Sequence, residues 1–236
     1  MHGTWVIARR ELASYSAAPV AYVTVTVFLG VVGYAFFGQV FSAGETSLRD
    51  FFALCPRLFL LLAPALTMRL LAEERRGKTL EVLLALPITE WEVVLGKHLA
   101  ALVVLAVALL PTLAYPLALS QLGELDWGPV TAGYLGLLLL AATYLALGLL
   151  ASSWTSSQTL ALVGALALSL PLYVVGELAE LLPPSQRELP RFLDLGRHFD
   201  NLARGIVDSR DLVYYLTLTF GCLFLATRSL EQRERG

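Results

Sequence analysis

The residues with the clearest chemical potential gather in one charged segment, 73–97. Within it, Gly77-Lys78-Thr79 matches the end of a phosphate-binding loop, in which backbone N–H groups and a lysine hold the phosphates of a nucleotide. That loop also needs an earlier glycine, where this chain has Ala72, and a preceding strand in an α/β unit. We therefore expect that this chain binds no nucleotide and no other cofactor.

Other side chains that could do chemistry are scattered along the chain. The three histidines, His2, His98 and His198, belong to no zinc motif and to no nucleophile-and-base motif. Cys55 and Cys222 fall in apolar runs without metal-ligand spacing, and we interpret them as small core residues. We therefore expect no metal site and no enzymatic activity of the chain by itself.

Composition indicates the elements that must position these residues. Hydrophobic residues make up 57% of the chain and charged residues 15%, and the mean hydropathy is +0.68; these values are typical of integral membrane proteins. A hydrocarbon core of about 30 Å takes about 20 helical residues to cross. We predict an all-α membrane protein with one transmembrane domain, 1–236, whose six spans are 18–41, 51–71, 98–122, 129–151, 157–177 and 212–228.

Lys and Arg indicate the orientation. Six spans place both termini on one side, which also holds both lysines of the chain, and cytoplasmic loops retain positive residues. We therefore expect both termini in the cytoplasm. No cleavable signal peptide is recognisable, so we expect the first span to remain as an anchor. Before that span, the pattern from Trp5 to Leu12 is typical of a helix in the membrane interface or of a simple polar flank.

The segment 72–97 is predicted to form a bent elbow between the second and third spans. Leucines recur at helical spacing in it, Pro87 ends that helix, and Thr89 with Glu92 forms a capping box for the next. A leucine ridge with flanking charges suits docking into the groove of a soluble partner, and it suits equally a helix on the lipid surface. The candidate residues of the elbow are Glu73, Glu74, Arg75, Arg76, Thr79, Leu80, Glu81, Leu83, Leu84 and Pro87.

Polar groups are scarce inside the predicted spans. Arg57 is the exception, about two helical turns into the second span, and we expect it either to face a protein interior or to reach outward. Prolines 64, 111, 116 and 171 are expected to kink or interrupt their spans. Such apolar spans disfavour a proton- or sodium-coupled carrier.

The loop 178–211 is patterned as short amphipathic helices, broken by Pro190 and Gly196. These helices would close a pathway, bind an extracytoplasmic partner, or simply cap the ends of the fifth and sixth spans. All three interpretations fit the pattern.

Several stretches together resemble one family. Residues 64–76, 79–89 and 93–97 resemble the signature of type-2 ABC exporter (ABC-2) permeases of the gliding-motility class, and residues 8–12 and 198–215 resemble the same group. The likeness covers essentially the whole chain, and it is specific for the class rather than for a substrate.

The resemblance implies an N-terminal interfacial helix, a cytoplasmic coupling helix in the elbow and short outer helices between the fifth and sixth spans. It implies two permease chains, identical or different, with separate ABC ATPase subunits that bind ATP-Mg, in the bacterial or archaeal cytoplasmic membrane. The elbow candidates become ATPase-coupling residues, although Lys78 stands where the family usually has glycine. The outer-loop candidates are His198, Phe199, Asp208 and Arg210.

The expected function is that of a permease subunit, in which ATP hydrolysis by a partner drives the export of a hydrophobic or lipid-linked substrate. We expect contacts with membrane lipid and no nucleic-acid partner. One alternative is the mechanical transmission of ATP-driven motion to an extracytoplasmic accessory protein. Another is a stand-alone channel or carrier.

Overall fold

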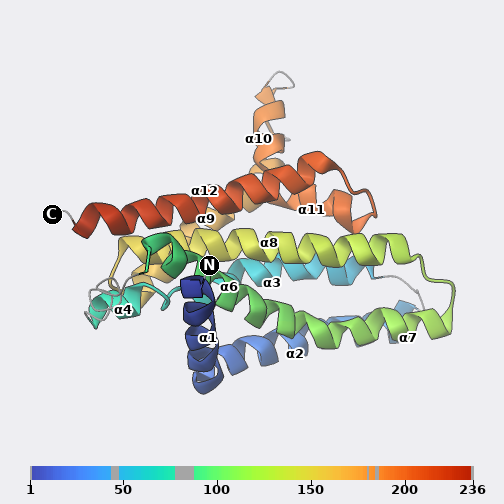
Figure 1. Ribbon diagram of the computed structural model, residues 1–236. Coiled ribbons are helices and arrows are strands. Elements are labelled where there is room, and N and C mark those ends of the chain that lie inside the picture. The colour runs from blue at the N-terminus through green and yellow to red at the C-terminus, as the bar shows by residue number, and fades with distance from the viewer. Residues whose placement is uncertain (1, 44–47, 78–87, 180, 184–185, 235–236) are drawn as a thin grey trace.

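The computed structural model describes residues 2–43, 48–77, 88–179, 181–183 and 186–234, and all regular secondary structure in them is helical (Figure 1). Six helical segments are long and apolar enough to cross a membrane, which confirms the predicted all-α class and the number of spans. The helices are α1 (His2–Ala17), α2 (Pro19–Ala43), α3 (Arg49–Thr67), α4 (Ala72–Arg76), α6 (Glu90–Leu109), the 3₁₀ turn η1 (Leu110–Leu113), α7 (Ala114–Leu122), α8 (Trp127–Trp154), α9 (Gln158–Ala179), α10 (Glu188–Leu193), α11 (Leu195–Ala203) and α12 (Ser209–Glu234).

Helix α8 forms the centre of the bundle. It packs against α3, α9 and α12, and 78% of its most apolar window is buried, against 17% for α9. Small residues let its neighbours approach: a side chain at Gly133 would collide with the ring of Phe52, and one at Gly148 would collide with the hydroxyl of Thr67. Close backbone approach through small residues is how membrane helices gain packing contacts.

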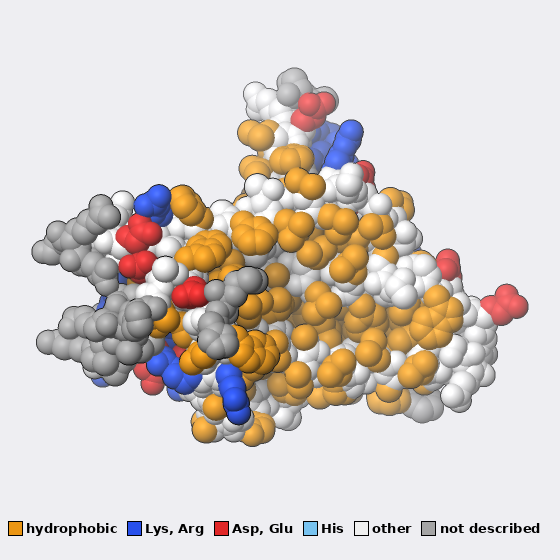
Figure 2. Space-filling model, in the orientation of Figure 1, with side chains coloured by type: hydrophobic (Ala, Val, Ile, Leu, Met, Phe, Trp, Pro, Cys, Tyr) orange, Lys and Arg blue, Asp and Glu red, His pale blue; other side chains and the backbone are white. Residues whose placement is uncertain are grey.

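Apolar and charged side chains separate along the long axis of the bundle. Figure 2 shows hydrophobic side chains over the middle of the molecule and charged ones at its ends. Large apolar residues in the middle are exposed, among them Phe37, Val163 and Phe220. A hydrocarbon layer covers such surface without cost, and this is the arrangement of a multi-pass membrane protein.

Two spans are interrupted in the structure. α6 ends at Leu109, and Pro111 lies in the 3₁₀ turn that connects it to α7, as the proline pattern predicts. The second span breaks between Thr67 and Ala72, where α3 gives way to α4. By contrast, α9 stays helical through Pro171.

The last helix extends beyond the predicted span 212–228 at both ends. α12 has 26 residues in all. A span as short as 212–228 predicts that the Asp211 side chain reaches out to the membrane surface, but this side chain is buried, with 3% exposure. The reason is a partner, because Asp211 pairs with His198 of α11.

Candidate functional site

The candidate coupling region lies at the end of the bundle that carries α4 (Figure 1). Of the predicted elbow residues, Glu73, Glu74, Arg75 and Arg76 form most of α4, and Glu73 pairs with Arg69 one turn earlier, at 3.2 Å. The remaining candidates lie outside the described residues; they are Thr79, Leu80, Glu81, Leu83, Leu84 and Pro87.

A buried lysine connects the two flanks of the elbow. Lys97 of α6 is 1% exposed, and its Nζ lies 2.9 Å from Glu11 Oε1 of α1 and 2.9 Å from Glu74 Oε1 of α4. Arg10 of α1 joins the same carboxylates, at 2.6 Å from Glu74 and 3.1 Å from Glu11. We call Arg10, Glu11, Glu74 and Lys97 the ion cluster. It holds the N-terminal helix, the start of the elbow and the helix after the elbow at one point.

Burial makes this pairing obligatory. A lysine taken out of water is stable as a cation only when carboxylates and hydrogen bonds compensate its lost hydration. The two glutamates supply that compensation, and Arg10 balances the second negative charge. The three elements are therefore joined by charge as well as by packing.

The N-terminal helix crosses α6 at a glycine. A Cβ atom at Gly96 would lie 2.8 Å from the backbone oxygen of Thr4 and 2.9 Å from Ile7, so only glycine permits this approach. α6 begins with the predicted capping box, in which Thr89 Oγ1 accepts from the Glu92 N–H and the Glu92 carboxylate accepts from the Thr89 N–H. The crossing and the cap place Lys97 beside Glu11.

The break between α3 and α4 is held by a side chain of the central helix. Ser152 Oγ accepts from the backbone N–H groups of Leu71 and Ala72, at 3.2 and 3.0 Å, and donates to the Met68 carbonyl. Tyr15 of α1 donates to the carbonyl of Leu66 just before the break. Burial raises the pKa of the Tyr15 hydroxyl, which therefore stays protonated as a donor. Backbone groups freed by the break thus have partners, as a membrane interior requires.

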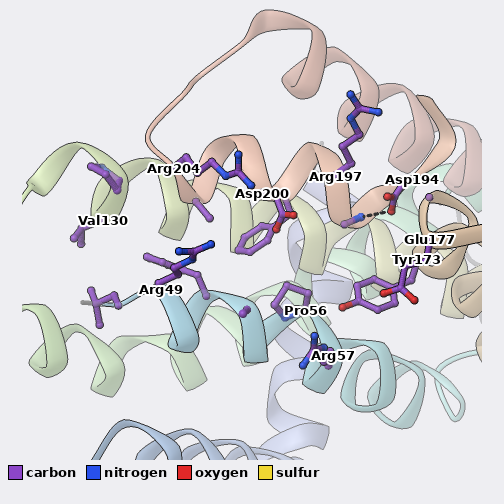
Figure 3. A pocket seen from close by; sticks show the side chains of 18 of the residues that line it. Arg49, Pro56, Arg57, Val130, Tyr173, Glu177, Asp194, Arg197, Asp200 and Arg204 are labelled. Atoms are coloured by element: carbon purple, nitrogen blue, oxygen red, sulfur yellow. Dashed lines mark hydrogen bonds between the residues drawn. The ribbon is translucent and has the colours of Figure 1, made fainter. Parts of the chain in front are cut away.

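At the opposite end, Arg57 reaches a cavity between α3, α8, α9 and α11 (Figure 3). The side chain is exposed and lies beside Tyr173 and Glu177 of α9. Arg57 thus faces a cavity between helices, where its side chain is exposed and not buried in packed interior.

The four outer-loop candidates do not form one site. His198 Nδ1 lies 2.6 Å from Asp211, its Nε2 lies 2.8 Å from the Phe192 carbonyl, and its ring stacks on Tyr214 at 4.1 Å. Phe199 is buried near Phe52. By contrast, Asp208 accepts from the Arg210 N–H, and both side chains are exposed.

Sequence reasoning missed the partners in both clusters. Glu11 and Asp211 lie in stretches that resemble the family, but nothing in the sequence pairs Glu11 with Lys97 or Asp211 with His198. A signal did exist at Lys97: a lysine at the start of an apolar span predicts that a carboxylate will meet it. Among the residues that the structure describes, no group of three His, Cys, Asp or Glu side chains could hold a metal ion.

Comparison with protein families gives one match. The family model for ABC-2 family transporter proteins matches residues 24–219, which covers the second to fifth spans in full and parts of the first and sixth. No curated protein sequence matches the chain. Members of this family are membrane permeases that work with an ABC ATPase subunit. The chain belongs to the ABC-2 family of transporter proteins.

Proposed function

We propose that this chain is the permease subunit of an ABC-2 exporter of the gliding-motility type, and that segment 73–87 couples it to the ATPase. Two permease chains, identical or different, would pair with two ATPase subunits that carry ATP-Mg, in the bacterial or archaeal cytoplasmic membrane with both termini in the cytoplasm. The substrate would be hydrophobic or lipid-linked. We retain the predicted spans 18–41, 51–71, 98–122, 129–151, 157–177 and 212–228 as the membrane-crossing parts of the domain.

The ion cluster is the observation that carries this proposal. In the sequence, segment 78–87 connects α4 to α6, and Lys97 of α6 pairs with Glu74 of α4 and with Glu11 of α1. A force applied to the segment by a soluble partner would therefore act on three helices together. Charge pairs buried at such a junction resist separation more strongly than exposed ones.

The direct test is a pull-down of the tagged chain from its native membrane in a mild detergent, with identification of the copurifying proteins and an ATPase assay. A stoichiometric Walker-type ATPase is expected. A chain that purifies alone and without ATPase activity would contradict the proposal and would favour a stand-alone channel or carrier.

A second experiment tests the coupling residues. Replacing Leu80, Leu83 and Leu84 together by Asp should release the ATPase, because charged side chains cannot enter an apolar groove. The matched control is Leu189→Asp on α10, a leucine that is 70% exposed and lies outside the elbow. Normal stoichiometry of the triple variant would refute the assignment of the leucines as anchors.

The mechanical role remains a second candidate because α10 projects from the bundle (Figure 1). Leu189 and Phe192 are exposed on it, at 70% and 57%, and exposed apolar residues on a projection suit an accessory protein. ATPase activity of the purified complex separates the two roles. Stimulation of the ATPase activity by a lipid or peptide would support a transport role. Stimulation by a copurifying extracytoplasmic protein would support a mechanical role.

A further inference from the structure

A large cavity among the described residues lies on the part of the bundle remote from α4, and nothing in the coupling role uses it (Figure 3). Its volume is about 1050 Å³, which is large enough for a ligand of drug size or for a lipid headgroup. Its wall combines apolar side chains with charged ones. The arginines that line it are Arg49, Arg57, Arg191, Arg197 and Arg204.

Two of these arginines belong to α3. Arg49 and Arg57 stand two helical turns apart on α3, and both line the cavity, as does Ala53 between them. Phe52 and Pro56 also line the cavity. A cation within a membrane span is costly and marks a functional site by default.

The opposite wall brings a third arginine to the same space. Arg204 follows α11, and Figure 3 shows Arg204, Asp200 and Arg49 close together across the cavity. Burial raises the pKa of the Asp200 carboxyl, and the charges of Arg204 and Arg49 offset part of that rise. Gly205, with a φ of 84°, then turns the chain back against Pro129.

Half of the acidic residues in the wall are already engaged by backbone groups. Asp126 accepts from the Gly128 N–H at the start of α8, and Asp194 accepts from the Gly196 N–H at the start of α11, both at 2.9 Å. These aspartates cap helices, where their charge is matched by the helix N-terminus. The cavity wall as a whole carries five arginines against the four carboxylates Asp126, Glu177, Asp194 and Asp200, so its formal charge is positive by one.

We propose that this cavity binds the phosphate-bearing headgroup of an anionic membrane amphiphile. Arg49, Arg57 and Arg204 would hold the phosphate, since guanidinium groups donate paired hydrogen bonds to phosphate oxygens. Phe52 and Pro56 would contact the first carbons of the acyl chains. A soluble phosphate compound has the same phosphate chemistry as the headgroup, but it lacks acyl chains that could contact the apolar wall. The site stands independently of ATPase coupling, because binding is measured on the permease chain alone.

The experiment is native mass spectrometry of the full chain, released from nanodiscs that contain equal amounts of phosphatidylglycerol and phosphatidylcholine with matched acyl chains. The wild-type chain is expected to retain phosphatidylglycerol in preference. Arg57→Gln and Arg204→Gln should each lower that preference about tenfold, the loss expected for one charge-assisted contact. The lipid preference of Arg57→Lys should lie between those of the wild-type chain and Arg57→Gln, because lysine keeps the charge but cannot donate paired hydrogen bonds.

Arg210→Gln is the matched control. Arg210 is exposed at the same end of the molecule and does not line the cavity, so the preference should be unchanged. Gel filtration and circular dichroism establish that each variant is folded, and Arg204→Gln, which lies outside the spans, tests the site if Arg57→Gln does not fold.

Three outcomes would overturn the proposal. Equal retention of the two lipids by the wild-type chain would show that the cavity does not select anionic headgroups. Equal losses in Arg210→Gln and in the cavity variants would show a general effect of surface charge. Displacement of phosphatidylglycerol by millimolar inorganic phosphate would assign the cavity to a soluble phosphate compound instead of a membrane amphiphile.

Discussion

Replacing Lys97 by Met should destabilise the chain strongly. The substitution keeps the volume and removes a cation that is 1% exposed and lies 2.9 Å from both Glu11 and Glu74. Removing one partner from a buried ion pair costs about 3–5 kcal/mol. Arg10 stays within 2.6 Å of Glu74 and 3.1 Å of Glu11 and offsets part of the loss, so we expect the lower end, about 3 kcal/mol. At about 2–4 °C per kcal/mol for a chain of this size, Tm should fall by about 6–12 °C.

The assay is thermal unfolding of the detergent-solubilised chain, followed by circular dichroism and by loss of the folded peak on gel filtration. The control is Arg228→Met, which removes the ion pair between Arg228 and Glu231. The side chains of Arg228 and Glu231 are 56% and 30% exposed, and an exposed pair of this kind stabilises the fold by about 0.5 kcal/mol. Adding Glu11→Gln to Lys97→Met should recover at least half of the loss, because it removes a carboxylate left without its lysine. If Lys97→Met melts no lower than Arg228→Met, the ion cluster does not stabilise the junction.

Three further predictions use the same melting assay. Ser152→Ala should cost about 1–3 kcal/mol, because the N–H groups of Leu71 and Ala72 lose their acceptor; Ser153→Ala, whose hydroxyl bonds only within its own helix, should cost less. Gly148→Ala should cost about 1–3 kcal/mol by overpacking against Thr67, and adding Thr67→Ala should restore part of it; no recovery would refute the contact. Tyr215→Phe should cost about 1–3 kcal/mol, since it leaves the Leu195 carbonyl without its donor at 2.8 Å; an unchanged Tm would mean that water replaces the hydroxyl.

Local features of the fold could be predicted from the sequence. The apolar runs give six spans, and the capping box at Thr89 and Glu92 marks the start of α6. The interruption at Pro111 follows from the missing N–H of proline. Each of these features depends only on residues within a few turns of the same helix, so it can be predicted from a single sequence.

Long-range pairing could not be predicted. Ser152 and Leu71 lie 81 residues apart and Lys97 and Glu11 lie 86 apart, and only the packing of α8, α1 and α6 brings each pair together. Asp211 shows the same limit. Its position before an apolar run predicts outward extension, yet α11 folds back and offers His198 as a partner. Burial of a charge depends on what packs over it, and the pattern of one helix does not contain that information.

The central helix gives the molecule one rigid path between its two ends. The first turn of α8 lines the outer cavity through Pro129 and Val130, and its last turn holds the break between α3 and α4 through Ser152. Its 28 residues are helical without interruption and span about 42 Å at 1.5 Å per residue. A tilt of this helix near Ser152 would move its far end sideways, so that a small movement at the break between α3 and α4 would change the width of the cavity with no relay of side chains between them.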